Sequence, residues 1–185
     1  MFEGPSNCEE LSALAAHMGG ISREDFLARF REPFLVVEMS ETGDTRDFRT
    51  LSTADDTRKT QPGAKVVDGP DVRTCVYVIR KSERNAFQAM VTLGRANNND
   101  IVVEHPCVSK FHGVFKRNPS EKRDAFVDVG STNGTYFRGT SLGQNTAVPL
   151  SSGDAVNLGG AVLATYFAPD EFYDYIELLR RTGKL

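Results

Sequence analysis

Short apolar runs, separated by turn-forming residues, recur along the chain from residue 74 to residue 167. The runs are rich in Val, Ile, Phe, Tyr and Thr, and the segments between them are rich in Asn, Asp, Gly and Ser. Many short strands with closely spaced turns are typical of an all-β sandwich or barrel. We therefore predict an all-β fold with strands at residues 34–39, 75–79, 87–93, 101–103, 113–115, 125–129, 135–137, 155–158 and 161–167.

Helical patterns precede and follow the predicted strands. Within residues 6–32, we expect Asn7 to cap one short helix and Ser22 to cap a second. A third helix is expected to begin at Pro169, because proline is favoured in the first turn. Two short helices cannot form a stable core alone, so the N-terminal pair should dock on the β domain or pair with another chain.

The chain is therefore expected to have three parts. Residues 1–32 form an N-terminal helical appendage, residues 33–168 form the β-sandwich, and residues 169–185 form a C-terminal helix. Residues 40–72 within the sandwich are polar and rich in Thr, Asp, Gly and Pro, which predicts a long flexible loop.

The charge balance and hydropathy exclude two classes of partner. The 22 Lys and Arg residues face 25 Asp and Glu residues, which gives a formal net charge of −3. That balance argues against a protein that binds nucleic acid over its whole surface. The apolar runs are short and the N-terminus has no apolar signal segment, so we expect neither secretion nor insertion into a membrane.

The three cysteines, Cys8, Cys75 and Cys107, lack CxxC spacing. An odd number without that spacing indicates free thiols in a reducing compartment, so we expect a cytoplasmic protein. The three histidines are scattered along the chain, whereas a zinc site needs four ligands. We expect neither a metal nor another cofactor.

Three polar segments, at residues 93–101, 108–113 and 128–135, fall between predicted strands. They offer a guanidinium, an ammonium, several hydroxyls and an amide, with no evident catalytic base. Such donors suit a phosphate dianion. Arg95 can bind two phosphate oxygens at once, which a lysine cannot do.

The segments GR…NDI, SKFHG and DVGSTNGT, followed by LSSGD and LG, occur in this order over roughly residues 75–168. This ordered set resembles the forkhead-associated (FHA) domain. The resemblance implies a β-sandwich of about eleven strands whose apical loops bind a phosphothreonine peptide. The compact chain around a single module further suggests a bacterial protein.

The same resemblance implies a role for each matching residue. The residues implied to contact the phosphate are Arg95, Ser109, Lys110 and Thr132. Asn133 is implied to bind the peptide backbone, and Lys110 departs from the Arg or Asn that is usual at its position. The residues implied to support the site are Gly94, His112, Gly113, Ser131 and Gly134.

The resemblance also bears on which peptides are selected. In this family the loop before the site serine helps to read the residue three places after the phosphothreonine. That loop is residues 105–108 here and contains no arginine. We therefore expect no strong demand for an acidic residue at that place in the peptide.

These features predict a phosphothreonine-peptide-binding adaptor in Ser/Thr kinase signalling. The alternative is a phosphate-independent assembly protein, for example in a secretion or cell-envelope complex, that uses the sandwich and the N-terminal helices for contacts, including self-association. An enzyme is not expected, because Ser109, His112 and Asp128 lack a nucleophile elbow.

Eight Ser and Thr residues fall within residues 40–60, and Thr53 precedes Asp56 by three residues. We predict that a kinase phosphorylates Thr53 and that the phosphothreonine then occupies this domain's own site or that of a neighbouring molecule. Intact-mass analysis after treatment with a partner kinase would contradict this prediction if the loop carried no phosphate.

Overall fold

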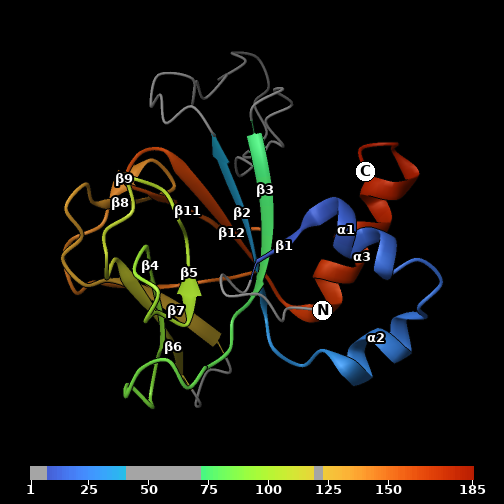
Figure 1. The fold of residues 1–185 in the computed structure, drawn as a ribbon, viewed down its shortest axis with the longest axis horizontal. Helices are drawn as coiled ribbons and strands as arrows, with labels where there is room; N and C mark the ends of the chain where they lie inside the picture. The colour runs from blue at the N-terminus through green and yellow to red at the C-terminus, as the bar shows by residue number, and fades with distance from the viewer. Residues whose placement is uncertain (1–7, 41–71, 119–122) are drawn as a thin grey trace.

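The computed structural model describes residues 8–40, 72–118 and 123–185. Its described strands form two β-sheets that face one another, and three helices pack on the outer face of the larger sheet (Figure 1). This arrangement confirms the predicted all-β sandwich with a helical pair before it and a helix after it.

Seven described strands form the larger sheet, in which neighbouring strands are antiparallel. In spatial order they are β1 (Glu9–Glu10), β3 (Val72–Val78), β2 (Phe34–Ser40), β12 (Val162–Phe167), β11 (Ala155–Leu158), β8 (Thr135–Phe137) and β9 (Thr140–Ser141).

Five described strands form the smaller sheet, in which β4 and β5 are parallel and the other neighbours antiparallel. In spatial order they are β10 (Ala147–Pro149), β7 (Arg123–Asp128), β6 (Gly113–Asn118), β4 (Val91–Gly94) and β5 (Ile101–Val102).

The register of the smaller sheet brings three loops to one end of the sandwich. Gly113 lies opposite Leu93 of β4 and opposite Asp128 of β7. The end of β4, the start of β6 and the end of β7 therefore lie side by side. The polar segments that the sequence places at these three points emerge together.

The core between the sheets is built from alternate residues of each strand, because successive side chains point to opposite faces. Leu35 and Val37 of β2 point inward and are fully buried. Phe115 and Phe126 of the smaller sheet meet edge to face there, with ring centroids 5.2 Å apart.

The opposite face of β2 packs against the helices α1 (Leu11–His17), α2 (Arg23–Arg29) and α3 (Pro169–Arg181). Phe34 stacks on Phe172 of α3, with ring centroids 4.1 Å apart. The ring centroid of Phe26 in α2 lies 5.8 Å from that of Phe34, and Phe26 is also fully buried. The N-terminal helices thus dock on the sandwich, one of the two arrangements that the sequence left open.

The helix boundaries test the capping predictions. The Ser22 hydroxyl accepts a hydrogen bond from the Asp25 backbone N–H at 3.1 Å, and α3 begins at Pro169, as predicted. The first helix begins at Leu11, later than expected, because Glu9 and Glu10 pair with β3 instead. The expected cap Asn7 lies outside the described residues.

The strand predictions differ from the structure mainly at short edge elements. The strands β1, β9 and β10 were not predicted, because they are two or three residues long and have no alternating apolar pattern of their own. The strand predicted at 87–93 begins only at Val91. Most of the loop predicted at 40–72, including Thr53, lies outside the described residues.

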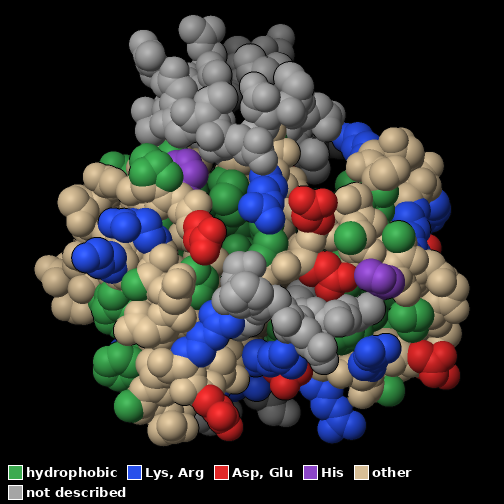
Figure 2. All heavy atoms as spheres, viewed as in Figure 1, with side chains coloured by type: hydrophobic (Ala, Val, Ile, Leu, Met, Phe, Trp, Pro, Cys, Tyr) green, Lys and Arg blue, Asp and Glu red, His purple; other side chains and the backbone are tan. Residues whose placement is uncertain are grey.

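The described helices include none that is long and apolar enough to cross a membrane. Within the described ranges, His, Cys, Asp and Glu side chains do not gather in groups of three that could hold a metal ion. Figure 2 shows Lys and Arg side chains interspersed with Asp and Glu on the face in view. Mixed charge of this kind follows from the nearly balanced composition.

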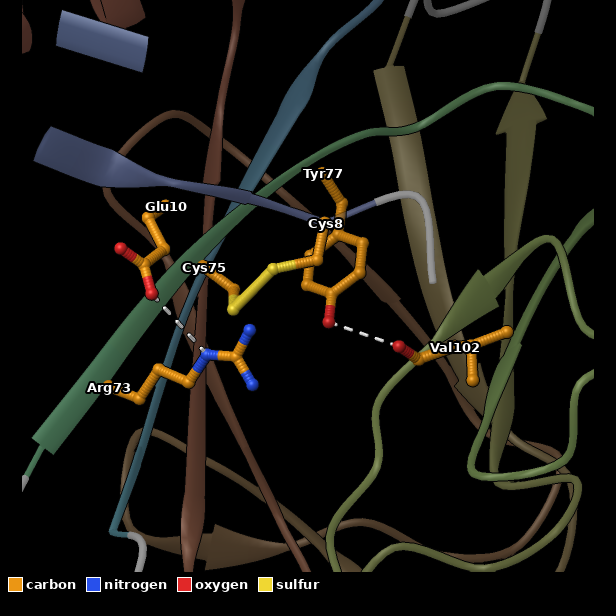
Figure 3. The surroundings of a disulfide bond; sticks show 6 residues. All are labelled: Cys8, Glu10, Arg73, Cys75, Tyr77 and Val102. Atoms are coloured by element: carbon orange, nitrogen blue, oxygen red, sulfur yellow. Dashed lines mark hydrogen bonds and ion pairs between the residues drawn. A yellow bond between two sulfur atoms is a disulfide. The ribbon is translucent and has the colours of Figure 1, made fainter. Parts of the chain in front are cut away.

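The structure corrects the prediction of three free thiols, because Cys8 and Cys75 form a disulfide (Figure 3). Pairing of β1 with β3 brings the two Cα atoms to 5.6 Å, a separation typical of disulfides. The two cysteines are 67 residues apart, so no local spacing could indicate the pair. Cys107 is a free thiol.

The expected reducing, cytoplasmic environment rested on free thiols at all three cysteines. Disulfides persist mainly in oxidising compartments. Cys8 and Cys75 therefore no longer support that expectation.

Replacing Cys8 by serine is expected to lower the free energy of unfolding by about 2–4 kcal/mol, because the disulfide restricts the unfolded chain. Urea denaturation of the full chain, with and without reductant, measures the change. Reductant should lower the stability of the wild type and leave Cys8→Ser unchanged. Thiol titration of the unfolded chain should find one thiol before reduction and three after it. Three thiols before reduction would contradict the pairing.

Candidate functional site

Hydrogen bonds join the loop after β4 (95–100), the loop between β5 and β6 (103–112) and the loop between β7 and β8 (129–134). The Arg95 backbone N–H donates to the Ser109 carbonyl at 2.9 Å. The Thr132 backbone N–H donates to the Ser109 hydroxyl, also at 2.9 Å. Ser109 thus links both neighbouring loops and brings Arg95 and Thr132 to the same place.

Arg95 is exposed, and its guanidinium is held at one nitrogen. Its Nε donates to the Val108 carbonyl at 3.0 Å. That bond fixes the plane of the guanidinium against the β5–β6 loop. The two terminal nitrogens have no hydrogen bond to another described residue, so their donors can bind a ligand.

Ser109 and Thr132 present hydroxyls beside Arg95. The Ser109 hydroxyl accepts from the Thr132 N–H and donates to the Thr132 Oγ1 at 3.3 Å. Thr132 is exposed, and Ser109 is half-buried. The pair therefore offers hydroxyls that are positioned by the backbone and reachable from solvent.

Lys110 and Asn133 are both exposed at the same end. The Lys110 backbone carbonyl accepts from the Ala96 N–H at 3.2 Å, so the residue is fixed while its ammonium extends outward. The Asn133 Nδ2 donates to the Cys107 carbonyl at 3.1 Å, which ties the β7–β8 loop to the β5–β6 loop.

His112 is fully buried beneath Ser109, and its hydrogen bonds determine which ring nitrogen carries the proton in the neutral form. Its Nδ1 accepts from the Ser109 N–H at 3.1 Å, so in the neutral ring the proton resides on Nε2. Nε2 then donates to the Thr135 Oγ1 at 3.1 Å. Burial lowers the pKa of His112 below its ordinary value, although the nearby Asp128 opposes that shift.

Asp128 completes this buried chain of hydrogen bonds. Its carboxylate accepts from the hydroxyls of Thr135 and Ser131, each at 2.6 Å, and from the Gly130 N–H at 2.8 Å. Burial alone would raise the pKa of Asp128, but the hydrogen bonds from Ser131, Thr135 and Gly130 outweigh it and lower the pKa. Ser131 thus supports the β7–β8 loop from within.

The three expected glycines lie where a side chain would interfere with the loops. A Cβ at Gly94 would clash with the Lys110 carbonyl, so the two loops approach closely only with glycine there. A Cβ at Gly113 would clash with the Phe126 ring. Gly134 has a φ of +74°, a left-handed conformation that glycine adopts at little cost.

Sequence reasoning missed a second set of braces around β4. The buried Asn99 donates from Nδ2 to the Lys110 carbonyl at 2.7 Å, which again joins two loops. Asp100 accepts from Lys81 Nζ at 2.8 Å and from the Thr92 N–H at 2.8 Å. Burial would raise the pKa of Asp100, but the bonds from Lys81 and Thr92 hold it well below its usual range. The signal available in the sequence was the pair Asn99-Asp100 directly before β5.

Two further surface features went unnoticed in the sequence. Phe87 and Phe111 are both exposed and stack with ring centroids 5.9 Å apart, beside Lys110. An open pocket next to Arg95 is lined by Arg95, Glu104, His105 and Pro106. Both features join residues from different loops, so local pattern could not reveal them.

The two facing sheets, with three loops joined by hydrogen bonds at one end, define a β-sandwich domain. Residues 91–159 match the family model of the FHA domain, the family that the sequence motifs predicted. The matched segment contains every predicted site residue from Gly94 to Gly134.

Bacterial regulators are among the relatives. The oxoglutarate dehydrogenase inhibitor of Corynebacterium diphtheriae is 41% identical over 68 residues, which are 37% of this chain and 44% of that protein. The glycogen accumulation regulator GarA of Mycobacterium tuberculosis is 34% identical over 87 residues, which are 47% of this chain and 51% of that protein. The chain thus spans about half the length of these relatives. The matches support the expected bacterial origin.

Among solved structures, the FHA domain of MEK1 is 17% identical to this chain. The TM-score is 0.43, and the alignment covers 75% of this chain and 90% of that one.

Acidification is expected to destabilise the protein as the pH falls below about 6.5, because the unfolded chain then binds a proton at His112 that the folded chain does not. Above that pH, His112 is neutral in both states and contributes no pH dependence. Urea denaturation between pH 7.5 and 5 measures the slope, and NMR of labelled imidazoles assigns it. A His112 resonance that titrates at or above the ordinary histidine value would contradict the expectation.

Proposed function

We propose that this FHA domain binds phosphothreonine peptides at the end of the sandwich where Arg95, Ser109 and Thr132 meet. The proposal rests on two hydrogen bonds of Ser109: its hydroxyl accepts from the Thr132 N–H, and its carbonyl accepts from the Arg95 N–H. Hydroxyl and guanidinium donors are thereby held at one exposed point, as a phosphate dianion requires.

Each side chain has a distinct part in the proposed complex. The terminal nitrogens of Arg95 bind two phosphate oxygens, while its Nε stays on Val108. The Ser109 hydroxyl exchanges its long 3.3 Å bond to Thr132 for a shorter, charge-assisted bond to phosphate. Lys110 adds a positive charge from the same loop.

Asn133 is proposed to bind the backbone of the peptide. An amide side chain has two N–H donors and one carbonyl acceptor, and one donor is used on Cys107. The remaining donor and the acceptor match the carbonyl and N–H groups of a peptide. The bond to Cys107 orients the Asn133 amide, so the remaining donor and acceptor can bind only peptide groups that lie in the matching direction.

The arrangement supports binding without catalysis. Both ring nitrogens of His112 are occupied, Nδ1 by the Ser109 N–H and Nε2 by Thr135. The ring therefore does not contact the Ser109 hydroxyl, as a general base would. We infer that His112 orders the loop and that the domain is not itself an enzyme.

The proposed partners are a phosphothreonine-containing protein and the Ser/Thr kinase that phosphorylates it. The names of two bacterial relatives describe an inhibitor and a regulator, which fits a protein that acts by binding. Phosphorylation at Thr53 and cytoplasmic localisation stay predictions.

Replacing Arg95 by alanine is expected to weaken binding of the full chain to phosphothreonine peptides by at least about tenfold, because a charge-assisted contact to phosphate is lost. Calorimetric titration with a degenerate phosphothreonine library, beside its unphosphorylated twin, measures the change. Arg95 is exposed, so the unfolding midpoint should not change.

The matched control is Arg181→Ala, which removes the same charge from the exposed end of α3 and should leave affinity unchanged. Equal affinity for phosphorylated and unphosphorylated pools would overturn the proposed function. Unchanged binding of the Arg95 variant would exclude Arg95 as the phosphate ligand.

A further inference from the structure

The pocket beside the proposed phosphate site contains charges of both signs. Its lining residues are Arg95, Glu104, His105 and Pro106. Arg95 and Glu104 are exposed, whereas His105 is buried and forms part of the wall. A ligand that enters this pocket therefore meets one guanidinium and one carboxylate.

The two charges in the pocket do not neutralise one another. Arg95 donates its Nε to Val108, and no ion pair joins it to Glu104 among the described residues. Arg73, which influences the same tyrosine as Glu104, points toward Glu10 with an N–O distance of 4.0 Å (Figure 3). Within the described ranges, the Glu104 carboxylate has no basic partner of its own.

Glu104 is held close to the site by the strand that precedes it. It follows β5 by two residues, and the Val102 carbonyl accepts a hydrogen bond from the buried Tyr77 hydroxyl at 3.0 Å (Figure 3). Val103 is fully buried, and its N–H donates to the Gly94 carbonyl at 3.0 Å. The backbone on the N-terminal side of Glu104 is thus fixed to the end of β4, directly before Arg95.

We propose that Glu104 makes this site selective for phosphothreonine peptides with a lysine or arginine close to the phosphothreonine. The phosphate binds Arg95, and the neighbouring cation of the peptide binds Glu104. This inference rests on the proposed function and adds the chemistry of the peptide to it.

The electrostatics favour that pairing over the alternatives. A second acidic group in the pocket would be repelled by both Glu104 and the phosphate. A cation would be attracted by both, and it would offset the repulsion between the phosphate and Glu104. Selection by Glu104 is therefore an attraction for basic peptides and a rejection of acidic ones.

Fluorescence anisotropy with the full chain tests the inference. The probes are phosphothreonine peptides with Lys, Ala or Glu placed in turn at each of the three positions on either side, with unphosphorylated twins. The lysine peptide should bind about two- to fivefold tighter than the alanine peptide at one or two positions, as for an exposed ion pair. The preference should weaken as salt is raised.

Two variants assign the preference to Glu104. Glu104→Gln removes the charge without changing the shape and should abolish the preference for lysine, while Glu104→Lys should reverse it in favour of glutamate. The matched control is Glu171→Gln on α3, an exposed position that should keep the wild-type preference.

The outcomes separate the two proposals. Tight binding of every phosphothreonine peptide, with equal affinity for Lys, Ala and Glu, would overturn the inference and leave the proposed function standing. An unaltered lysine preference in Glu104→Gln would overturn it as well. Failure of every phosphorylated peptide to bind would overturn the proposed function, and the inference with it.

Discussion

The end of the sandwich where the three loops meet depends on a buried series of hydrogen bonds that runs from Asp128 through Thr135 and His112 to the Ser109 N–H. The side chains of Asp128, Thr135 and His112 are buried, so they act on the site through the loops and not by contact with a ligand. Their bonds position the backbone of Ser109, which in turn holds Arg95 and Thr132. Burying a polar group without a hydrogen-bond partner costs free energy. This series of hydrogen bonds therefore favours one arrangement of the loops over its alternatives.

The sheets supply what that polar chain needs. The register at Gly113 aligns the ends of β4 and β7, so the loops start from fixed points on a packed sandwich. The helices cover the other face of the larger sheet, where Phe34 of β2 would face water without the ring of Phe172 from α3 stacked on it. β1 pairs along β3, which would otherwise be an unpaired edge strand.

The sequence indicated the features that have a local signature. Alternating apolar residues and turn glycines located most strands, and the Ser22 cap located α2, because these patterns span only a few residues. The ordered motifs indicated the FHA domain and the residues that meet at its end. The Cys8–Cys75 pair and the pocket at Glu104 join residues through the fold, so no single segment carries their signature. Roles at the phosphate stay predictions.

The disulfide links the two ends of residues 8–75 covalently. Cys8 and Cys75 close a covalent ring that contains α1, α2, β1 and β2. A protease that cuts one peptide bond within this ring opens the loop without releasing a fragment. The nicked protein keeps its mass, apart from one added water, until a reductant separates the pieces. The helices α1 and α2 and the strand β2 therefore remain covalently attached to the rest of the sandwich even when the backbone within the ring is broken.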